Sequence, residues 1–177
     1  MAENETPEIP VADVLVGDGD AQSGQQQVRV GILAQYVKDL SFENPNAPQS
    51  LQQKPDAPKP NMDVNVNVAA RKANEEVYEV ELKLTVNAKV EDTTSFVVEL
   101  LYAGLFQLVN LPEQALQPFL LVEAPRLIFP FARRIVSDAV RDGGFPPLML
   151  EPIDFAQLYR RQMESAAAGT NGGVAAN

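Results

Sequence analysis

Between residues 77 and 108 the sequence reads VYEVELKLTVNAKVEDTTSFVVELLYAGLFQL, and its two halves distribute their apolar side chains differently. In residues 77–90 apolar and polar side chains alternate, which is typical of a half-buried antiparallel strand with one dry and one solvated face. Residues 96–108 are apolar at both odd and even positions, so a strand here needs cover on both faces. Asp92-Thr93-Thr94 predicts a tight turn between the two strands.

Two more strands are predicted before this pair. In residues 62–70 valines alternate with polar residues, and the proline-rich stretch before them interrupts any ladder. The strand expected at residues 28–42 has one apolar parity, which consists of Val28, Val30, Ile32, Ala34 and Tyr36. Strands read in succession predict a four-stranded antiparallel sheet, and the helical segments that follow it place the protein in the α+β class.

The character of the sequence changes after residue 108. Residues 110–125 combine three prolines with apolar side chains, and we interpret them as an apolar loop. Helical spacing begins at Arg126 or Pro130 and ends at Asp142, where two glycines are a helix stop. An extended linker leads to a second helix of about ten residues, with Asp154 as its N-cap. Two short helices cannot cover both sheet faces, so the pattern predicts an oligomer that retains apolar grooves.

Both ends of the chain differ in composition from the part between them. Residues 1–27 hold six acidic and no basic residues, and residues 164–177 are rich in Ala, Gly and Asn, so both are predicted to be disordered tails. Residues 28–163 are then the single folded domain. The net charge of −10 argues against nucleic-acid binding, which favours a basic patch.

Composition also argues against most enzyme classes. The chain has no cysteine and no histidine, which excludes disulfides, thiolate or imidazole metal sites, and Ser-His-Asp triads. It has no glycine-rich phosphate loop and no paired carboxylates in an apolar setting. We therefore expect a protein without catalytic residues, metal or cofactor. The sequence lacks a signal-peptide pattern and the run of about 18 apolar residues that a membrane helix needs, so we expect a cytoplasmic protein that does not insert into membranes.

Four segments resemble the SecB family of protein-export chaperones. They read YVKDLSFENPNAP (residues 36–48), VYEVELKLTVNAKV (77–90), AGLFQL (103–108) and APRLIFPFARRIVSDAVRDGGFPPLMLEPIDFAQLY (124–159). The first and last are long, unusual in composition and in the family's order, and the resemblance covers about residues 28–163. It implies a four-stranded antiparallel sheet followed by two helices, assembled as a dimer of dimers. It also implies a chaperone that holds unfolded precursors in the cytoplasm and passes them to the SecA motor without using ATP or a metal.

The resemblance assigns candidate residues to SecA docking. By position, the family's acidic docking residues fall on Asp39, Glu43 and Glu99, and its apolar docking position falls on Val97. An exposed and partly acidic sheet face could attract a basic segment, chiefly through steering and rim contacts. Alternatively, these acids only keep an outer sheet face soluble.

Two further sets of residues are candidates for assembly and for client binding. Positions that affect dimer-of-dimers assembly in the family correspond to Val98, Leu100 and Tyr102, to which we add Ile128, Ile135 and Ala139 of the predicted helix. For clients of unrelated sequence, weak and non-directional apolar contacts along a groove are suitable. The expected groove residues are Phe106, Leu111, Phe119, Leu120, Phe129, Leu148, Met149 and Leu150. Ordinary core packing within one chain is the alternative for both sets.

Other functions are compatible with the same sequence. A SecB-like chaperone could serve a toxin–antitoxin pair or act as a general holdase. An apolar groove could instead belong to a small-ligand binder or a carboxylate-dependent enzyme, or the oligomer could be purely structural.

Overall fold

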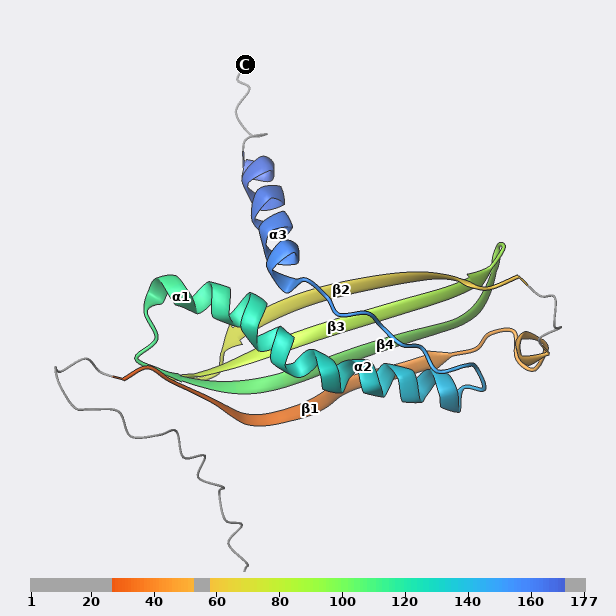
Figure 1. Cartoon of the computed structure of the whole chain (residues 1–177), viewed down its shortest axis with the longest axis horizontal. Helices are drawn as coiled ribbons and strands as arrows, with labels where there is room; N and C mark the ends of the chain where they lie inside the picture. Colours follow the sequence, from red (N-terminus) through yellow and green to blue (C-terminus); the bar gives the residue numbers. More distant parts are fainter. Residues whose placement is uncertain (1–26, 53–57, 171–177) are drawn as a thin grey trace, which may run out of the picture.

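The computed structural model describes residues 27–52 and 58–170 of the 177-residue chain. Four antiparallel strands form one sheet in the order β1-β4-β3-β2, with bounds β1 Arg29–Glu43, β2 Asn61–Lys72, β3 Val77–Val90 and β4 Thr93–Val109 (Figure 1). The predicted four-stranded antiparallel sheet is therefore confirmed. A short 3-10 helix, Gln49–Leu51, follows β1.

The hairpin between β3 and β4 is tighter than predicted. Val90 pairs with Thr93, so the turn consists of Glu91 and Asp92 rather than residues 92–94. Glu91 adopts the left-handed conformation with φ of 55°, which fits the positive φ that two-residue hairpin turns require.

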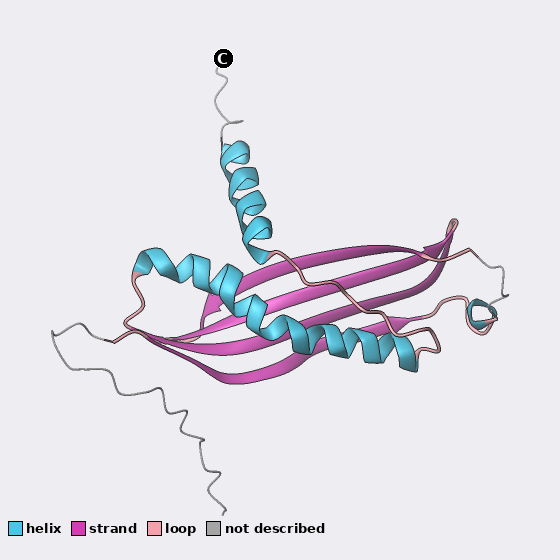
Figure 2. Ribbon diagram, viewed as in Figure 1, coloured by secondary structure: helices cyan, strands magenta, loops and turns pink. Residues whose placement is uncertain are grey.

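The predicted apolar loop at residues 110–125 is wrong, because most of this segment is helical. Helix α1 (Glu113–Pro118), a five-residue π-helix (Phe119–Glu123) and helix α2 (Ala124–Asp142) follow one another without a break (Figure 2). Proline removes a backbone donor and its ring clashes with the preceding turn. Here the wider π turn, in which the Ala124 N–H donates to the Phe119 carbonyl, directly precedes Pro125, which occupies the first turn of α2.

Helix α2 ends at Asp142, immediately before the glycine pair at residues 143–144 that predicted its end. The Phe145 N–H donates to the Val140 carbonyl at 3.2 Å, and the Gly144 N–H donates to the Arg141 carbonyl at 3.0 Å. Gly144 is left-handed, with φ of 88°. These features form a Schellman motif, in which glycine carries the conformation that costs other residues energy.

Helix α3 (Phe155–Thr170) begins where predicted but is longer. The Asp154 side chain accepts a hydrogen bond from the Gln157 N–H at 2.9 Å, which confirms the predicted N-cap. The helix spans 16 residues instead of about ten, so residues 164–170 are helical rather than part of a disordered tail. Figure 1 shows α3 pointing away from the sheet. The remaining tail predictions, for residues 1–26 and 171–177, lie outside the described residues.

One face of the sheet packs beneath α2 and forms the core. The even-numbered residues 80–88 of β3 and 96–108 of β4 are buried on this inner face. One of them, Gly104, has no side chain. A Cβ at Gly104 would lie 3.1 Å from Cγ2 of Ile128, so the missing side chain allows α2 to approach β4 closely. Burying one leucine or valine side chain of this kind contributes about 1.5–3 kcal/mol.

Strand β1 carries two bulges that change which face its side chains occupy. Ile32 pairs with Phe106, but Ala34 pairs with Leu105, and a second shift follows between Val37 and Asp39. Ile32 therefore shares the inner face with Phe106, while Ala34 shares the opposite, outer face with Leu105. The prediction that the even residues 28–36 lie on one face is thus wrong, because a bulge reverses the alternation.

A carboxylate is buried on the outer face of the sheet. Glu79 of β3 is only 3% exposed, and it accepts hydrogen bonds from the Tyr36 hydroxyl at 2.5 Å and from Lys38 Nζ at 3.2 Å. Arg71 Nε of β2 donates to its second oxygen, and Lys38 also pairs with Glu81. We call these five residues the Glu79 cluster. It links both edge strands to the sheet centre.

Burial by itself would raise the pKa of Glu79. The hydrogen bonds from Tyr36, Arg71 and Lys38 outweigh it and lower this pKa from 4.5 to about 2. The same contact with Glu79 raises the pKa of the Tyr36 hydroxyl.

The lowered pKa predicts acid sensitivity. Because Glu79 titrates near 4.5 in the unfolded chain and about 2 in the folded one, its contribution to stability is present above pH 4.5 and is lost as the pH falls toward 2. The free energy of unfolding from urea titrations should decrease more between pH 6.5 and pH 3 for the wild type than for Glu79→Gln. Glu76→Gln, a change of equal charge at an exposed turn, should follow the wild type. Parallel curves for the wild type and Glu79→Gln would contradict the assignment.

Candidate docking and client surfaces

The four predicted docking residues lie together on the outer face of the sheet. Glu43 pairs with Val97, while Asp39 pairs with Leu101, two positions beyond Glu99 on the same strand. Directly paired residues and alternate residues of a strand share a face, so all four side chains are on the face opposite α2. Asp39 and Glu43 are exposed, whereas Val97 and Glu99 are partly buried. We call Asp39, Glu43, Val97 and Glu99 the acidic face.

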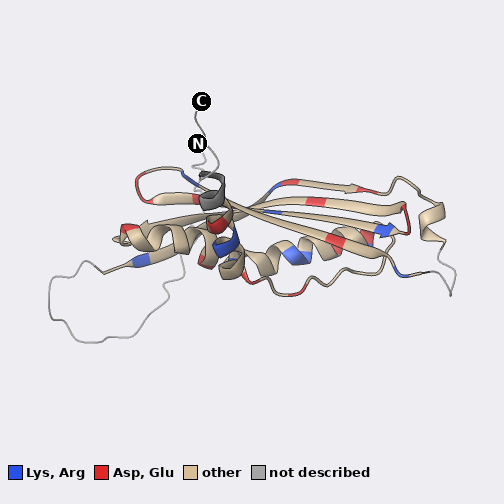
Figure 3. Ribbon diagram, turned by 90° about the horizontal axis from the view of Figure 1, so that it is seen from above, with Lys and Arg blue, Asp and Glu red and all other residues tan. Residues whose placement is uncertain are grey.

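A lysine next to the acidic face was not included in the predicted set. Lys83 Nζ of β3 lies 3.3 Å from Glu99 Oε2, and both side chains are about half exposed. Such an exposed pair contributes little to stability, but it places a positive charge beside the predicted docking carboxylate. Sequence alternation placed Lys83 on the solvated face, but only the strand register shows that it reaches Glu99. Figure 3 shows both signs of charge along the strands and along the helices.

The structure divides the predicted client residues into three groups. Phe106, Leu120 and Phe129 are buried, with at most 5% of each exposed. Leu111, Phe119, Leu148 and Leu150 are partly buried against the core. Met149 is 75% exposed, in the linker that crosses the helix-bearing face of the sheet between α2 and α3 (Figure 1). Only the last two groups offer surface to a client in this conformation of the protomer.

Exposed apolar side chains outside the predicted docking, client and interface sets lie mainly on the two edge strands and on α2. Groups of such residues on a protein surface often mark interaction sites. Met62 and Val64 of β2 pair with Ala88 and Val86, so they face the inner side, and they are 36% and 39% exposed. The others include Val28, Val30, Ile32, Leu33, Val37 and Leu40 of the β1 region, and Leu127 and Phe131 of α2.

The predicted interface residues lie mostly inside the protomer. Val98, Leu100, Tyr102 and Ile128 are at most 7% exposed, and they belong to the core beneath α2. Ile135 and Ala139 are partly buried against the same core. Any effect of the four buried residues on assembly would therefore be indirect, through packing of the subunit. The i, i+4 pair Leu127 and Phe131 is directly available on the solvent side of α2.

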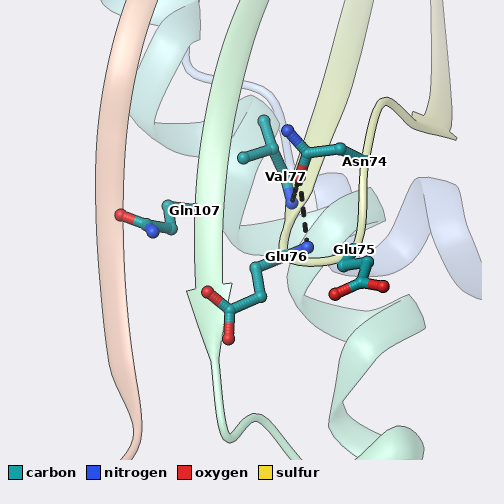
Figure 4. Close-up of a pocket in the computed structure, with 5 residues that line it drawn as sticks. All are labelled: Asn74, Glu75, Glu76, Val77 and Gln107. Atoms are coloured by element: carbon teal, nitrogen blue, oxygen red, sulfur yellow. Dashed lines mark hydrogen bonds between the residues drawn. The ribbon is translucent and has the colours of Figure 1, made fainter.

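A depression at one end of the sheet does not resemble a small-ligand site. It lies at the turn between β2 and β3 and is lined by Asn74, Glu75, Glu76, Val77 and Gln107 (Figure 4). The Asn74 side chain accepts hydrogen bonds from the backbone of residues 76 and 77, and the two carboxylates point in different directions. This arrangement stabilises a turn and offers neither an apolar pocket nor converging catalytic groups.

The described residues hold neither a candidate metal cluster nor a helix suited to crossing a membrane. These residues contain no group of three or more metal-ligating side chains. Within the same part of the chain, no helix combines the length and the apolar character needed to cross a membrane.

Comparison with known proteins gives consistent matches. The family model described as "Preprotein translocase subunit SecB" matches residues 23–166. The protein-export protein SecB of Rhizorhabdus wittichii is 56% identical over 140 residues, which cover 79% of this chain and 82% of that protein. The protein-export protein SecB of Xanthobacter autotrophicus is 53% identical over 135 residues, which cover 76% and 85%.

A solved structure has the same fold. It is the SecB-like chaperone of Mycobacterium tuberculosis in complex with a ChAD peptide from the HigA1 antitoxin. The TM-score is 0.59 and the identity 18%, over 71% of this chain and 91% of that chain. The family model extends over the sheet, α1, α2 and most of α3, and the two relatives each cover more than three quarters of this chain. This chain therefore belongs to the SecB family.

Proposed function

We propose that this protein is a cytoplasmic, ATP-independent export chaperone that holds unfolded precursors and delivers them to the SecA motor. The observation that carries the proposal is the separation of two surfaces: an acidic face on one side of the sheet and exposed apolar side chains on the helix-bearing side. Two separate surfaces would let the chaperone contact the motor while a client is still bound. The names of its close relatives and of its family support the same reading.

Client binding is assigned to the exposed part of the apolar surface. Met149 and its partly buried neighbours Leu148 and Leu150 lie on the linker, and Met62 and Val64 are open at the edge of the same sheet face. Apolar burial contributes about 25 cal/mol per Å² without directional demands, so unrelated sequences can bind. Met149 adds a flexible side chain that adapts to different partners. Phe106, Leu120 and Phe129 could contribute only if the segments that cover them move.

SecA docking is assigned to the acidic face. Three carboxylates around Val97 offer a negative potential to a basic partner segment, and the apolar side chain adds a site for burial. The exposed positions of Asp39 and Glu43 favour steering of the encounter.

Assembly as a dimer of dimers is supported by surfaces that one subunit leaves uncovered. Strand β1 is an edge strand with several exposed apolar side chains, and an unprotected edge of this kind favours pairing with another chain. Leu127 and Phe131 add an apolar stripe on the solvent side of α2. Two such surfaces on different elements allow two kinds of contact, as a dimer of dimers requires.

A chaperone role for a toxin–antitoxin pair is the alternative with less support from sequence identity. The relative whose structure contains an antitoxin peptide is 18% identical to this chain, whereas the export proteins are more than 50% identical.

Neutralising the acidic face should weaken SecA binding. Glu99→Gln and Asp39→Asn should each lower the affinity for SecA about tenfold, or about 1.4 kcal/mol, because each removes one charge from the face. Calorimetry at physiological salt, together with an aggregation assay, should show this loss with client holding unchanged.

Two variants control this experiment. Glu113→Gln removes an exposed acid from α1 and should bind SecA as the wild type does. Lys83→Gln removes the cation paired with Glu99 and should strengthen the binding. Normal SecA binding by Glu99→Gln would show that the acidic face is not the docking site.

Removing the exposed linker methionine should weaken client holding. Met149→Ser should lower the affinity for a reduced, unfolded precursor about two- to fivefold, because it removes apolar contact area. Met163→Ser is the matched control, since Met163 is also exposed, at 55%, but lies on α3. Light scattering during refolding of the precursor measures the effect. Equal suppression of aggregation by both variants would show that the linker is not the client surface.

Charging the stripe on α2 should divide the assembly. Sedimentation velocity should find the wild type as a tetramer, and Phe131→Arg should reduce it to dimers, because the change puts a charge into an apolar contact. Arg133→Gln on the same helix is the control and should remain tetrameric. A monomeric wild type would contradict the proposed assembly.

A further inference from the structure

We propose that Glu79 is a positioning residue for SecA docking: it holds β1 in the double-bulged register that places Asp39 and Glu43 beside Val97 and Glu99. The inference rests on the docking role proposed above. Glu79 itself lies outside the acidic face and is almost fully buried, so it would not touch SecA.

The Glu79 cluster reaches β1 across the intervening strand. Glu79 is on β3, and β4 separates it from Tyr36 and Lys38 on β1. Ala103 of β4 pairs with Tyr36 on one side and with Glu81 on the other, and it is fully buried. Because the Ala103 side chain is small, it leaves room above β4 for the side chains of Tyr36 and Lys38 to reach Glu79. A larger residue would stand between the strands and obstruct the contact.

The contacts to Glu79 come from the part of β1 whose side-chain alternation is reversed. The first bulge, at Leu33, turns Tyr36 to the outer face, and the second, at Lys38, restores the original alternation before Asp39. Tyr36 lies between the two bulges and Lys38 lies at the second one. Both donate to the same carboxylate oxygen of Glu79. The cluster therefore holds the segment in which the register changes.

The register in which β1 pairs with β4 determines how the carboxylates of the acidic face are arranged. Without either bulge, continued pairing of Val30 with Leu108 would put Asp39 directly opposite Glu99, where like charges repel. With the first bulge alone, Asp39 and Glu43 would turn toward the core. Only the observed register spaces the three carboxylates around Val97.

An edge strand needs such an anchor more than a central strand does. Among the residues that the structure describes, the backbone of β1 pairs only with β4, so this one ladder and the side chains of β1 must specify the register. The Glu79 carboxylate is 3% exposed, while its partners Lys38 and Arg71 reach solvent, and removing a donor from a buried carboxylate is costly. Arg71 of β2 holds the other oxygen and fixes the carboxylate from the opposite side.

The test compares three full-length variants: Tyr36→Phe, Glu79→Gln and the exposed control Glu76→Gln. SecA affinity by calorimetry should fall about tenfold for Tyr36→Phe, although its net charge is unchanged, and at least as much for Glu79→Gln. Amide exchange should become faster in residues 34–43 of both, and the nuclear Overhauser contacts between the backbones of Asp39 and Leu101 should weaken. Client holding should stay as in the wild type, because the proposed client residues lie outside β1, and Glu76→Gln should change nothing.

A double-mutant cycle separates positioning from a general loss of stability. If Glu79 acts through Asp39, the effects of Glu79→Gln and Asp39→Asn on SecA binding are less than additive, whereas independent effects add. Additive losses, or wild-type SecA binding by Tyr36→Phe while Glu99→Gln binds weakly, would overturn the positioning role and leave the docking face intact. Failure of the wild type to bind SecA would overturn the docking proposal and the positioning role together. If Glu79→Gln does not fold, Tyr36→Phe decides the question.

Discussion

The close approach of α2 to β4 is the contact on which the rest of the structure depends. Gly104 leaves room for Ile128, and the fully buried even-numbered residues of β3 and β4 pack around this contact. Because α2 covers one face only, strand alternation assigns the odd-numbered residues 97–109 of β4 to the other face. That face carries the acidic residues together with the partly buried side chains of Val97, Leu101 and Leu105, while the exposed apolar residues lie mainly on the edge strands, on α2 and on the linker. The two proposed functions are thereby kept apart.

The helical layer achieves this cover despite its prolines. Pro118, Pro125 and Pro130 each remove a backbone donor, yet residues 113–142 form consecutive helical segments. The π turn of residues 119–123 widens the helix ahead of Pro125, and buried side chains of α2 supply packing energy that exceeds the lost hydrogen bonds. Local proline rules predicted a loop because they do not include the energy of packing against a sheet. The error is one of tertiary context overriding local propensity.

The outer face shows that a buried charge can serve specificity of register rather than stability alone. Glu79 accepts hydrogen bonds from three side chains, and these come from both edge strands. Packing of apolar side chains tolerates small shifts, whereas a carboxylate that accepts from fixed donors favours one alignment. In this protein the alignment concerns a bulged edge strand, which has fewer backbone constraints than the strands inside the sheet.

The strand patterns at residues 28–42, 62–70, 77–90 and 96–108 were sufficient to predict the sheet. The glycine pair at 143–144 predicted the end of α2, and Asp154 predicted the N-cap of α3. These features follow from local periodicity and backbone chemistry, which the order of residues contains directly. The faces of β1, the ion pair of Lys83 with Glu99 and the burial of Phe106, Ile128 and Glu79 were decided only by the tertiary structure. They depend on where two bulges fall and on how closely one helix approaches one strand, and those positions result from the packing of residues far apart in the chain.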